Sequence, residues 1–290
     1  MRVEVDDRSG FCFGVVAAIA KAGESISAGQ PIVSLGDIVH NGAEVARLEA
    51  MGLRSVPEDF PLENLAGQTV LIRAHGEPPA TYEKAAEQGI TLIDATCPVV
   101  AKLQATVAEA WRKMQRLDGQ VVIFGKPGHA EVRGLAGHAG GVIVVESAAD
   151  LDRIDFGRSV YFLSQTTRSL ADFEELGREI MRRAADPRGV TIHDTICRQV
   201  SGREQHLAEF ARRFEVVIFV AGAKSSNGRV LFEAVRAANP CSHKIESASE
   251  LRPEWFAGKS SAGVCGATST PLWLMDGIAA GIRAMTPGTP

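Results

Sequence analysis

The chain has 290 residues, of which 45% are hydrophobic and 23% charged, a composition typical of globular proteins of one to three domains. Its formal net charge of −4 gives no electrostatic reason to bind nucleic acid, and no apolar run is long enough to cross a membrane. The charged N-terminus does not resemble a signal peptide, and the five cysteines form no Cys-x-x-Cys pair. We therefore expect a cytoplasmic protein without disulfides.

Taken in chain order, the predicted elements repeat three times. Each copy starts with a cysteine, which is followed by an amphipathic helix and then by an apolar strand that ends in polar residues. A second apolar strand and a second helix complete each copy. The cysteines that open the copies are Cys12, Cys97 and Cys197, and the apolar strands that follow them begin near Pro31, Val121 and Val216.

Short identities support a duplication behind this pattern. "DATC" at residues 94–97 returns as "DTIC" at 194–197, and "ESAADL" at 146–151 returns as "ESASEL" at 246–251. Strands that alternate with helices predict parallel βαβ units. We expect three repeated α/β domains (13–96, 97–196 and 197–290, with the N-terminal strand 1–12 packing on the last) that share a centre. The glycine-rich residues 134–141 are expected to form a loop, and the tail 285–290 to be disordered.

The three repeated cysteines each lie at a predicted strand end, directly before a helix. A helix N-terminus stabilises a thiolate, and three thiolates at one centre suit a soft metal site such as a 4Fe–4S cluster. A zinc site of three cysteines and one histidine, and a hydrolase with Cys97 or Cys197 as nucleophile, are the alternatives. Cys241 and Cys265 lie outside the repeated position, and we expect both to be small buried hydrophobic residues.

Polar residues follow the other predicted strands. Few of them are basic, with Lys126, Lys224 and Arg73 nearby, so neutral donors, histidines and backbone N–H groups are expected to bind a phosphate or diphosphate. Glu131, two residues from His129, is the natural proton donor of this set. The strand-end residues are His40, His75, His129, Thr166, Thr167, Ser225, Ser226, Asn227, Thr268 and Ser269. For His138, His193, His206 and His243 we expect only structural roles.

Nine motifs resemble, in order, those of the 4-hydroxy-3-methylbut-2-enyl diphosphate reductase family (IspH or LytB). They are "GFCFGV", "IVHN", "AHG", "DATCP", "GHAEV", "SQTT", "TIC", "SSN" and "ATSTP". The resemblance covers essentially the whole chain and implies a pseudo-threefold trefoil of three α/β domains around a 4Fe–4S cluster held by Cys12, Cys97 and Cys197. It departs at Val200, where better-known relatives carry a threonine near the substrate, and Ser201 is the hydroxyl expected to replace it.

The resemblance also implies an activity, namely the two-electron removal of a hydroxyl group from an allylic diphosphate to give isopentenyl and dimethylallyl diphosphate. Glu131 would supply protons, Thr166 or Thr167 would position the substrate hydroxyl, and ferredoxin or flavodoxin would donate electrons. The diphosphate would be held by His40, His75, His129, Ser225, Ser226, Asn227 and Ser269, with Thr268 as a further candidate. A cluster-based redox sensor is the competing non-enzymatic interpretation, and it would need neither Glu131 nor a diphosphate site.

Overall fold

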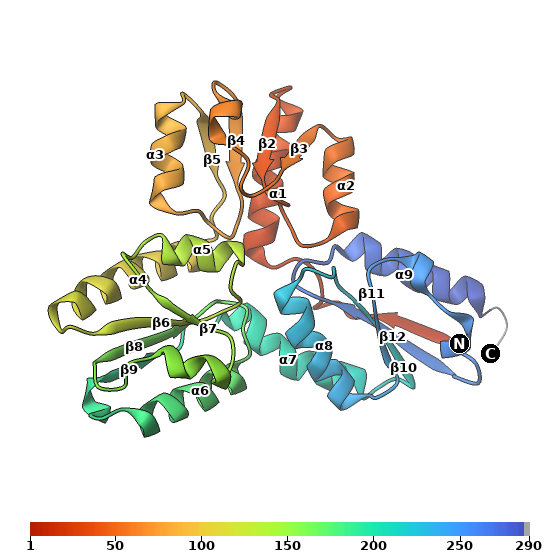
Figure 1. Cartoon of the computed structure of the whole chain (residues 1–290). Helices are drawn as coiled ribbons and strands as arrows, with labels where there is room; N and C mark the ends of the chain where they lie inside the picture. The colour runs from red at the N-terminus through yellow and green to blue at the C-terminus, as the bar shows by residue number, and fades with distance from the viewer. Residues whose placement is uncertain (287–290) are drawn as a thin grey trace. The chain divides into compact units, whose positions relative to one another are not determined.

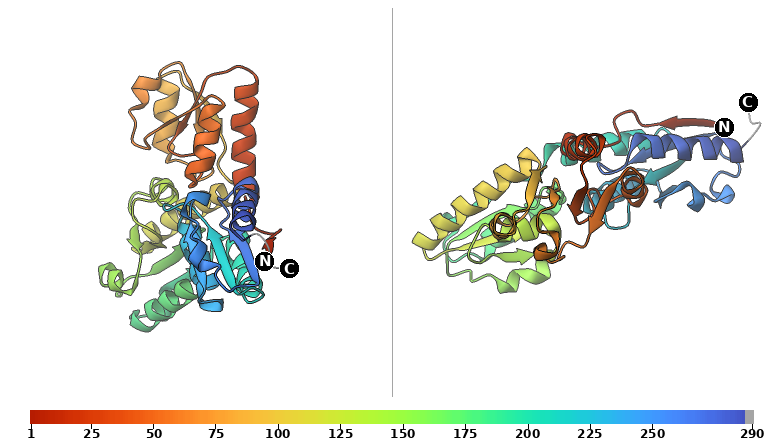
Figure 2. Two further views of the ribbon diagram at one scale, coloured as in Figure 1. Left: turned by 90° about the vertical axis from the view of Figure 1, so that its right-hand side faces the viewer. Right: turned by 90° about the horizontal axis from the view of Figure 1, so that it is seen from above.

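A computed structural model describes residues 1–286, and the remaining four residues of the tail that is expected to be disordered lie outside it. The chain forms two compact units. The first unit comprises residues 1–19, 37–53 and the chain from Arg198 onward, and the second comprises residues 20–36 and 54–197. The first helix, α1 (Phe13–Ser27), contributes residues 13–19 to the first unit and residues 20–27 to the second, and it is drawn as one continuous red helix in Figure 2. No helix within residues 1–286 combines the length and the apolar character needed to span a membrane.

Three parallel sheets of four strands form the framework. Across the first sheet the strands are β3 (Leu53–Val56), β2 (Ile32–Leu35), β4 (Thr69–Ile72) and β5 (Thr91–Asp94). Across the second they are β7 (Ile143–Val145), β6 (Gln120–Phe124), β8 (Val160–Ser164) and β9 (Val190–His193). Across the third they are β11 (Ser242–Ile245), β10 (Val216–Val220), β12 (Ser261–Gly266) and β1 (Arg2–Val5).

The second sheet shows why these residues form strands. Val121 and Ile123 of β6 point to one face and pack against α4 (Pro98–Arg116), whereas Val122 and Phe124 point to the other and pack against α6 (Leu170–Arg183). Figure 1 shows the two helices on opposite faces of the sheet. A central strand of a sheet covered on both faces is buried along nearly its whole length, which explains the uninterrupted apolar run of β6.

The third sheet is built in the same way from both ends of the chain. One face packs against α9 (Leu272–Met285), and the other packs against α7 (Arg198–Ala211) and α8 (Ser226–Ala238). The edge strand β1, red in Figure 1, pairs in parallel with β12 through the register Arg2 to Ser261 and Val5 to Val264. The first residues of the chain therefore complete a sheet whose other strands come from its last third.

The three sheets share one strand order, and the expected α/β fold with repeated parallel sheets is confirmed. The remaining helices are α2 (Gly42–Ala50), α3 (Pro79–Glu87) and α5 (Ala130–Ala136). The prediction of a loop over 134–141 is wrong at its start, because α5 continues to Ala136. A Cβ at Gly134 would lie 3.3 Å from the backbone oxygen of Gly76, so this glycine allows α5 to pack closely against the loop that follows β4.

Candidate active site

The three cysteines of the repeat occupy structurally equivalent positions. Each follows the edge strand of its sheet, and the next residue begins a helix, namely α1, α4 or α7. Each cysteine N–H also donates to a carbonyl oxygen in the loop that follows the neighbouring strand. These bonds join Cys97 to Ala74 (3.1 Å), Cys197 to Thr166 (2.9 Å) and Cys12 to Thr268 (3.1 Å). All three thiols are half-buried and outside any disulfide.

The Asp-x-x-Cys pattern has a local explanation. Asp94 Oδ1 accepts a hydrogen bond from the backbone N–H of Thr96 (2.8 Å), and Asp194 Oδ1 accepts one from that of Ile196 (3.0 Å). Each aspartate thus forms the tight turn that this residue type favours, and the turn ends one residue before the cysteine. The carboxylate bends the chain at the strand end and directs it into the next helix.

Glu131 is a buried acid in the first turn of α5. Its side chain is only 1% exposed, and both oxygens are bound by one residue: the backbone N–H of Thr166 donates to Oε1 (2.7 Å) and Thr166 Oγ1 donates to Oε2 (2.8 Å). Burial raises the pKa of Glu131 to about 7, against the opposing effect of these two hydrogen bonds. A substantial fraction of the carboxyl groups therefore carries a proton at neutral pH, as a general acid requires.

Two histidines, His75 and His129, belong to the same unit as this acid, and His129 is only two residues from it in the sequence. His129 is the N-cap of α5, and its Nδ1 accepts a hydrogen bond from the backbone N–H of Glu131 (3.2 Å). The hydrogen of the neutral ring is therefore on Nε2, which makes that atom a donor. The ring of His75 meets that of His129 edge to face, with centroids 5.4 Å apart.

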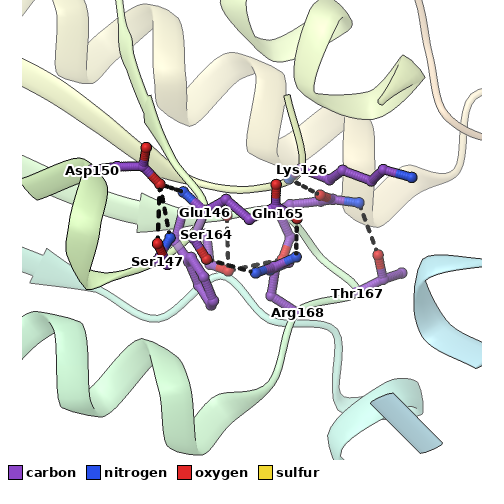
Figure 3. Close-up of polar contacts among 9 residues, drawn as sticks. Lys126, Glu146, Ser147, Asp150, Ser164, Gln165, Thr167 and Arg168 are labelled. Carbon is purple, nitrogen blue, oxygen red and sulfur yellow. Dashed lines mark hydrogen bonds and ion pairs between the residues drawn. The ribbon is translucent and has the colours of Figure 1, made fainter. Parts of the chain in front are cut away.

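Gln165, which the sequence did not single out, connects two loops of the second unit. Its Oε1 accepts a hydrogen bond from the backbone N–H of Lys126 (3.0 Å), and its Nε2 donates to Thr167 Oγ1 (2.9 Å), as Figure 3 shows. The side chain is fully buried. Gln165 therefore fixes the loop before His129 relative to the loop that carries Thr166 and Thr167. Its only signal in the sequence was its place between Ser164 and Thr166 at a strand end.

The first unit contributes a second set of polar residues at the start of α8. Ser225 is the N-cap, its Oγ accepts from the N–H of Gly228 (2.9 Å), and it lies 3.2 Å from the Oγ of Ser269. Asn227 Oδ1 accepts two hydrogen bonds from Thr268, one from the backbone N–H (3.0 Å) and one from Oγ1 (2.7 Å).

Two polar atoms of this set are buried without a partner. Within residues 1–286, Ser226 Oγ and Asn227 Nδ2 have no hydrogen-bonding partner, although the two residues are only 6% and 4% exposed. An unsatisfied buried donor costs roughly 1–3 kcal/mol, so such groups in native proteins usually bind a ligand or water. Their place at the N-terminus of a 13-residue helix favours an anion.

His40 lies beside this second set. It precedes Asn41, the N-cap of α2, whose Oδ1 accepts from the N–H of Glu44 (3.1 Å). A Cβ added to Gly222 would lie 2.2 Å from the backbone oxygen of His40. Glycine is therefore required where the loop after β10 crosses the loop that carries His40.

The predicted site residues thus fall into two groups, one in each unit. The second unit holds His75, Cys97, His129, Glu131, Thr166, Thr167 and Cys197, and the first unit holds Cys12, His40, Ser225, Ser226, Asn227, Thr268 and Ser269. Arg73 carries no exposed charge to the site, because it is 1% exposed and pairs with Glu58 (2.7 Å).

The other cysteines and histidines have local environments of their own. Cys265 is buried in the core of the third sheet, and burial raises the pKa of its thiol well above the usual value. The expectation of burial is wrong for Cys241, which is exposed because it lies on the turn between α8 and β11. The remaining histidines contact protein groups. His138 bonds with the carbonyl oxygen of Gly134, His193 with the hydroxyl of Tyr161 and His206 with the carboxylate of Asp6, while the ring of His243 stacks on that of Trp255.

Fold and site together define an α/β enzyme, with a buried acid, half-buried cysteines and buried polar groups placed at the carboxyl ends of parallel strands. Similarity to known proteins narrows this class. The model of the family described as LytB protein matches residues 3–283, and the chain belongs to this family.

Relatives and solved structures agree with this assignment. Two relatives are named 4-hydroxy-3-methylbut-2-enyl diphosphate reductase. The one from Bacteroides thetaiotaomicron is 48% identical to this chain and the match covers 96% of both proteins. The one from Porphyromonas gingivalis is also 48% identical, and the match covers 98% of this chain and 99% of the relative. A solved (E)-4-hydroxy-3-methyl-but-2-enyl diphosphate reductase, the terminal enzyme of the non-mevalonate pathway, covers 98% of this chain and 100% of its own, with TM-score 0.70 and 32% identity. The reductase of Plasmodium falciparum shares the fold, with TM-score 0.84, 23% identity and coverage of 97% and 88%.

Proposed function

We propose that this protein reduces (E)-4-hydroxy-3-methylbut-2-enyl diphosphate to isopentenyl and dimethylallyl diphosphate, the last step of the methylerythritol phosphate route to isoprenoids. The reaction consumes two electrons and two protons: the C–O bond to the hydroxyl group breaks, one proton leaves with that hydroxyl as water, and the other forms a new C–H bond on the allyl group. Family membership supports the reaction, and the observation that carries it is the buried Glu131 bound at both oxygens by Thr166, with a pKa of about 7.

The three equivalent cysteines suit an iron–sulfur cluster. Cys12, Cys97 and Cys197 would hold a 4Fe–4S cluster, because each is a half-buried thiol, outside any disulfide and directly before a helix, where a thiolate is stabilised. When bound, such a cluster would pass the two electrons on from an external donor, one at a time, and would offer one iron to the substrate oxygen. We further propose that the repeats 13–96, 97–196 and 197–290 surround it as a trefoil, with the strand of residues 1–12 packed on the last.

The diphosphate is assigned to the neutral and imidazole donors. Ser226 Oγ and Asn227 Nδ2, which lack partners within residues 1–286, would donate to its oxygens together with backbone N–H groups at the start of α8. Because His129 Nδ1 accepts a hydrogen bond, its Nε2–H is the donor turned to the ligand. His40, His75, Ser225 and Ser269 complete the proposed set.

Glu131 and Thr166 form the proposed proton path. With Glu131 ionised, the Thr166 hydroxyl donates to Oε2, whereas with Glu131 protonated, Oε2–H donates to Thr166 Oγ1 and frees the threonine hydrogen for a substrate oxygen. A proton can therefore move from Glu131 through Thr166 to the departing hydroxyl, which then leaves as water. Thr167, oriented by Gln165, would assist in placing that hydroxyl.

Electrons would come from a small redox protein, a ferredoxin or flavodoxin, in the cytoplasm. The hydrolase, zinc-site and redox-sensor interpretations are disfavoured by membership of the family, and none of them needs both a buried acid and an anion site. The zinc site and the hydrolase also predict a different metal content from the proposed cluster, so metal analysis distinguishes them from the reductase.

The test is an analysis of protein purified without oxygen. We expect about four irons and four sulfides per chain, brown absorption, and reduction of the hydroxylated diphosphate by an artificial electron donor. Zinc in place of iron, or a loaded cluster with no turnover of this substrate, would overturn the proposal.

A further inference from the structure

Thr268, in the loop after β12, makes hydrogen bonds in two directions. Its backbone N–H (3.0 Å) and its Oγ1 (2.7 Å) both donate to Asn227 Oδ1. Its carbonyl oxygen accepts from the backbone N–H of Cys12 (3.1 Å). The residue is buried, so these bonds form away from bulk water, where they are strongest.

The two donors decide which atom of the Asn227 amide faces the site. A backbone N–H can only donate, so the atom that it contacts must be the acceptor oxygen. The hydroxyl of Thr268 adds a second donor to the same oxygen. The amide is thereby held with Nδ2 turned away from Thr268, buried and without a partner within residues 1–286.

We propose that Thr268 is a positioning residue, which binds no ligand itself and sets the affinity for the substrate diphosphate by fixing the orientation of the Asn227 amide. This inference rests on the proposed function, and it separates Thr268 from the diphosphate ligands because both of its donors are used within the protein. Loss of the hydroxyl would leave Asn227 Oδ1 with one donor. The amide could then rotate and present its oxygen, an acceptor, to an anion that has only acceptors.

The experiment compares Thr268→Val with two matched controls in the cluster-loaded enzyme. Valine keeps the shape and both backbone bonds of Thr268 and removes only the side-chain bond to Asn227, whereas Thr268→Ser keeps that bond. Thr270→Val is the second control, because it removes a buried hydroxyl bond to the Val220 carbonyl (2.7 Å) in the same loop. Each variant is assayed for iron content, KM, kcat and inhibition by inorganic pyrophosphate.

We expect Thr268→Val to raise KM and the pyrophosphate inhibition constant about 3- to 10-fold, the usual effect of one neutral hydrogen bond. Iron content and kcat should stay close to wild type. Thr268→Ser should restore both constants, and Thr270→Val should leave them unchanged. If valine prevents folding, Thr268→Ala, which also keeps both backbone bonds, gives the same comparison.

A double-mutant cycle tests whether the effect passes through Asn227. In an Asn227→Ala background Thr268→Val should change pyrophosphate inhibition less than about 2-fold, because no amide remains to be oriented. An equal effect in both backgrounds, or no effect of Thr268→Val in the otherwise wild-type enzyme, would overturn the inference. Should the wild type fail to reduce the substrate, the proposed function fails instead, and calorimetric binding of pyrophosphate by the same variants still decides the role of Thr268.

Discussion

Two pairs of residues, Glu131 with Thr166 and Asn227 with Thr268, use one structural arrangement for different chemistry. In each pair a threonine after the third strand of its sheet donates through N–H and Oγ1 to the second residue of a helix. Each threonine also accepts, through its carbonyl oxygen, the N–H of a cysteine, Cys197 in one pair and Cys12 in the other. The two pairs differ mainly in whether the helix residue is an acid or an amide.

That difference decides what is left for a ligand. A carboxyl group has two oxygens, so each donor of Thr166 finds its own, and the group stays able to gain or lose a proton. An amide has one oxygen, which takes both donors of Thr268 and leaves Nδ2 unpaired within residues 1–286. Under the proposed function, the acid pair would transfer protons near pH 7, and the amide pair would donate hydrogen bonds at any physiological pH.

The largest expected effect comes from replacing the cysteine whose N–H donates to the threonine of either pair. Cys197→Ser and Cys12→Ser should each lose most of the cluster and all turnover, because a neutral hydroxyl is a poor ligand for iron. Iron and sulfide analysis after anaerobic reconstitution measures the loss. The exposed Cys241, changed to serine, is the control and should retain iron; loss of iron in that variant would contradict the assignment of ligands.

Glu131→Gln makes the acid pair resemble the amide pair. Glutamine can keep both hydrogen bonds to Thr166 but has no proton to give, so kcat should fall by about 100-fold or more with little change in KM. Anaerobic turnover with a chemical reductant measures both constants, and equal iron contents provide the control. Turnover within about 5-fold of wild type would remove Glu131 as the acid.

Asn227→Asp is the reverse exchange. A carboxylate in this place has no N–H to donate and repels the diphosphate, so KM should rise by about 30-fold or more at about pH 8, with a smaller change in kcat. Burial should raise the pKa of this new acid, as it does for Glu131, so the rise in KM should shrink as the pH is lowered. A pH-independent rise would show that the two pairs are not equivalent.

The smallest expected effect is the pH dependence of turnover, which distinguishes the acid pair from the amide pair without changing a residue of the enzyme. Glu131 acts in its protonated form, which is lost as the pH rises through about 7, so kcat should fall up to about tenfold per pH unit above that value. Initial rates between about pH 6 and 9 give the profile. Glu131→Gln should lack this decline, and a wild-type rate that rises with pH in this range would contradict the assigned role.

Much of the fold was predictable because periodicity reports burial directly. The run Val216 to Val220 is fully buried between helices, and an uninterrupted apolar strand of this kind indicates a sheet covered on both faces. The cysteine positions were predictable for a related reason, since a duplicated strand end reproduces its surroundings along with its residues. The matching turns at Asp94 and Asp194 show how local that reproduction is.

The contacts inside the site were not predictable, because they join loops far apart in sequence. Thr268 and Asn227 are separated by 41 positions, and whether a threonine binds the ligand or orients another residue depends on one side-chain rotation. The role of Gln165 was not predictable, because it depends on hydrogen bonds to Lys126 and Thr167 that form only in the folded loops. The exposure of Cys241 depends on where a turn falls, which composition does not report.

The pairing of β1 with β12 also sets the order of events during synthesis. The first strand emerges from the ribosome long before its partner at residues 261–266 exists, and the carbonyl of Thr268 that binds Cys12 follows only then. Until that moment the N-terminal strand is an unpaired edge that other chains or chaperones can bind. We therefore expect cluster insertion to be a late, post-translational event, and a truncated chain that lacks β12 to retain the second unit while losing the place for Cys12.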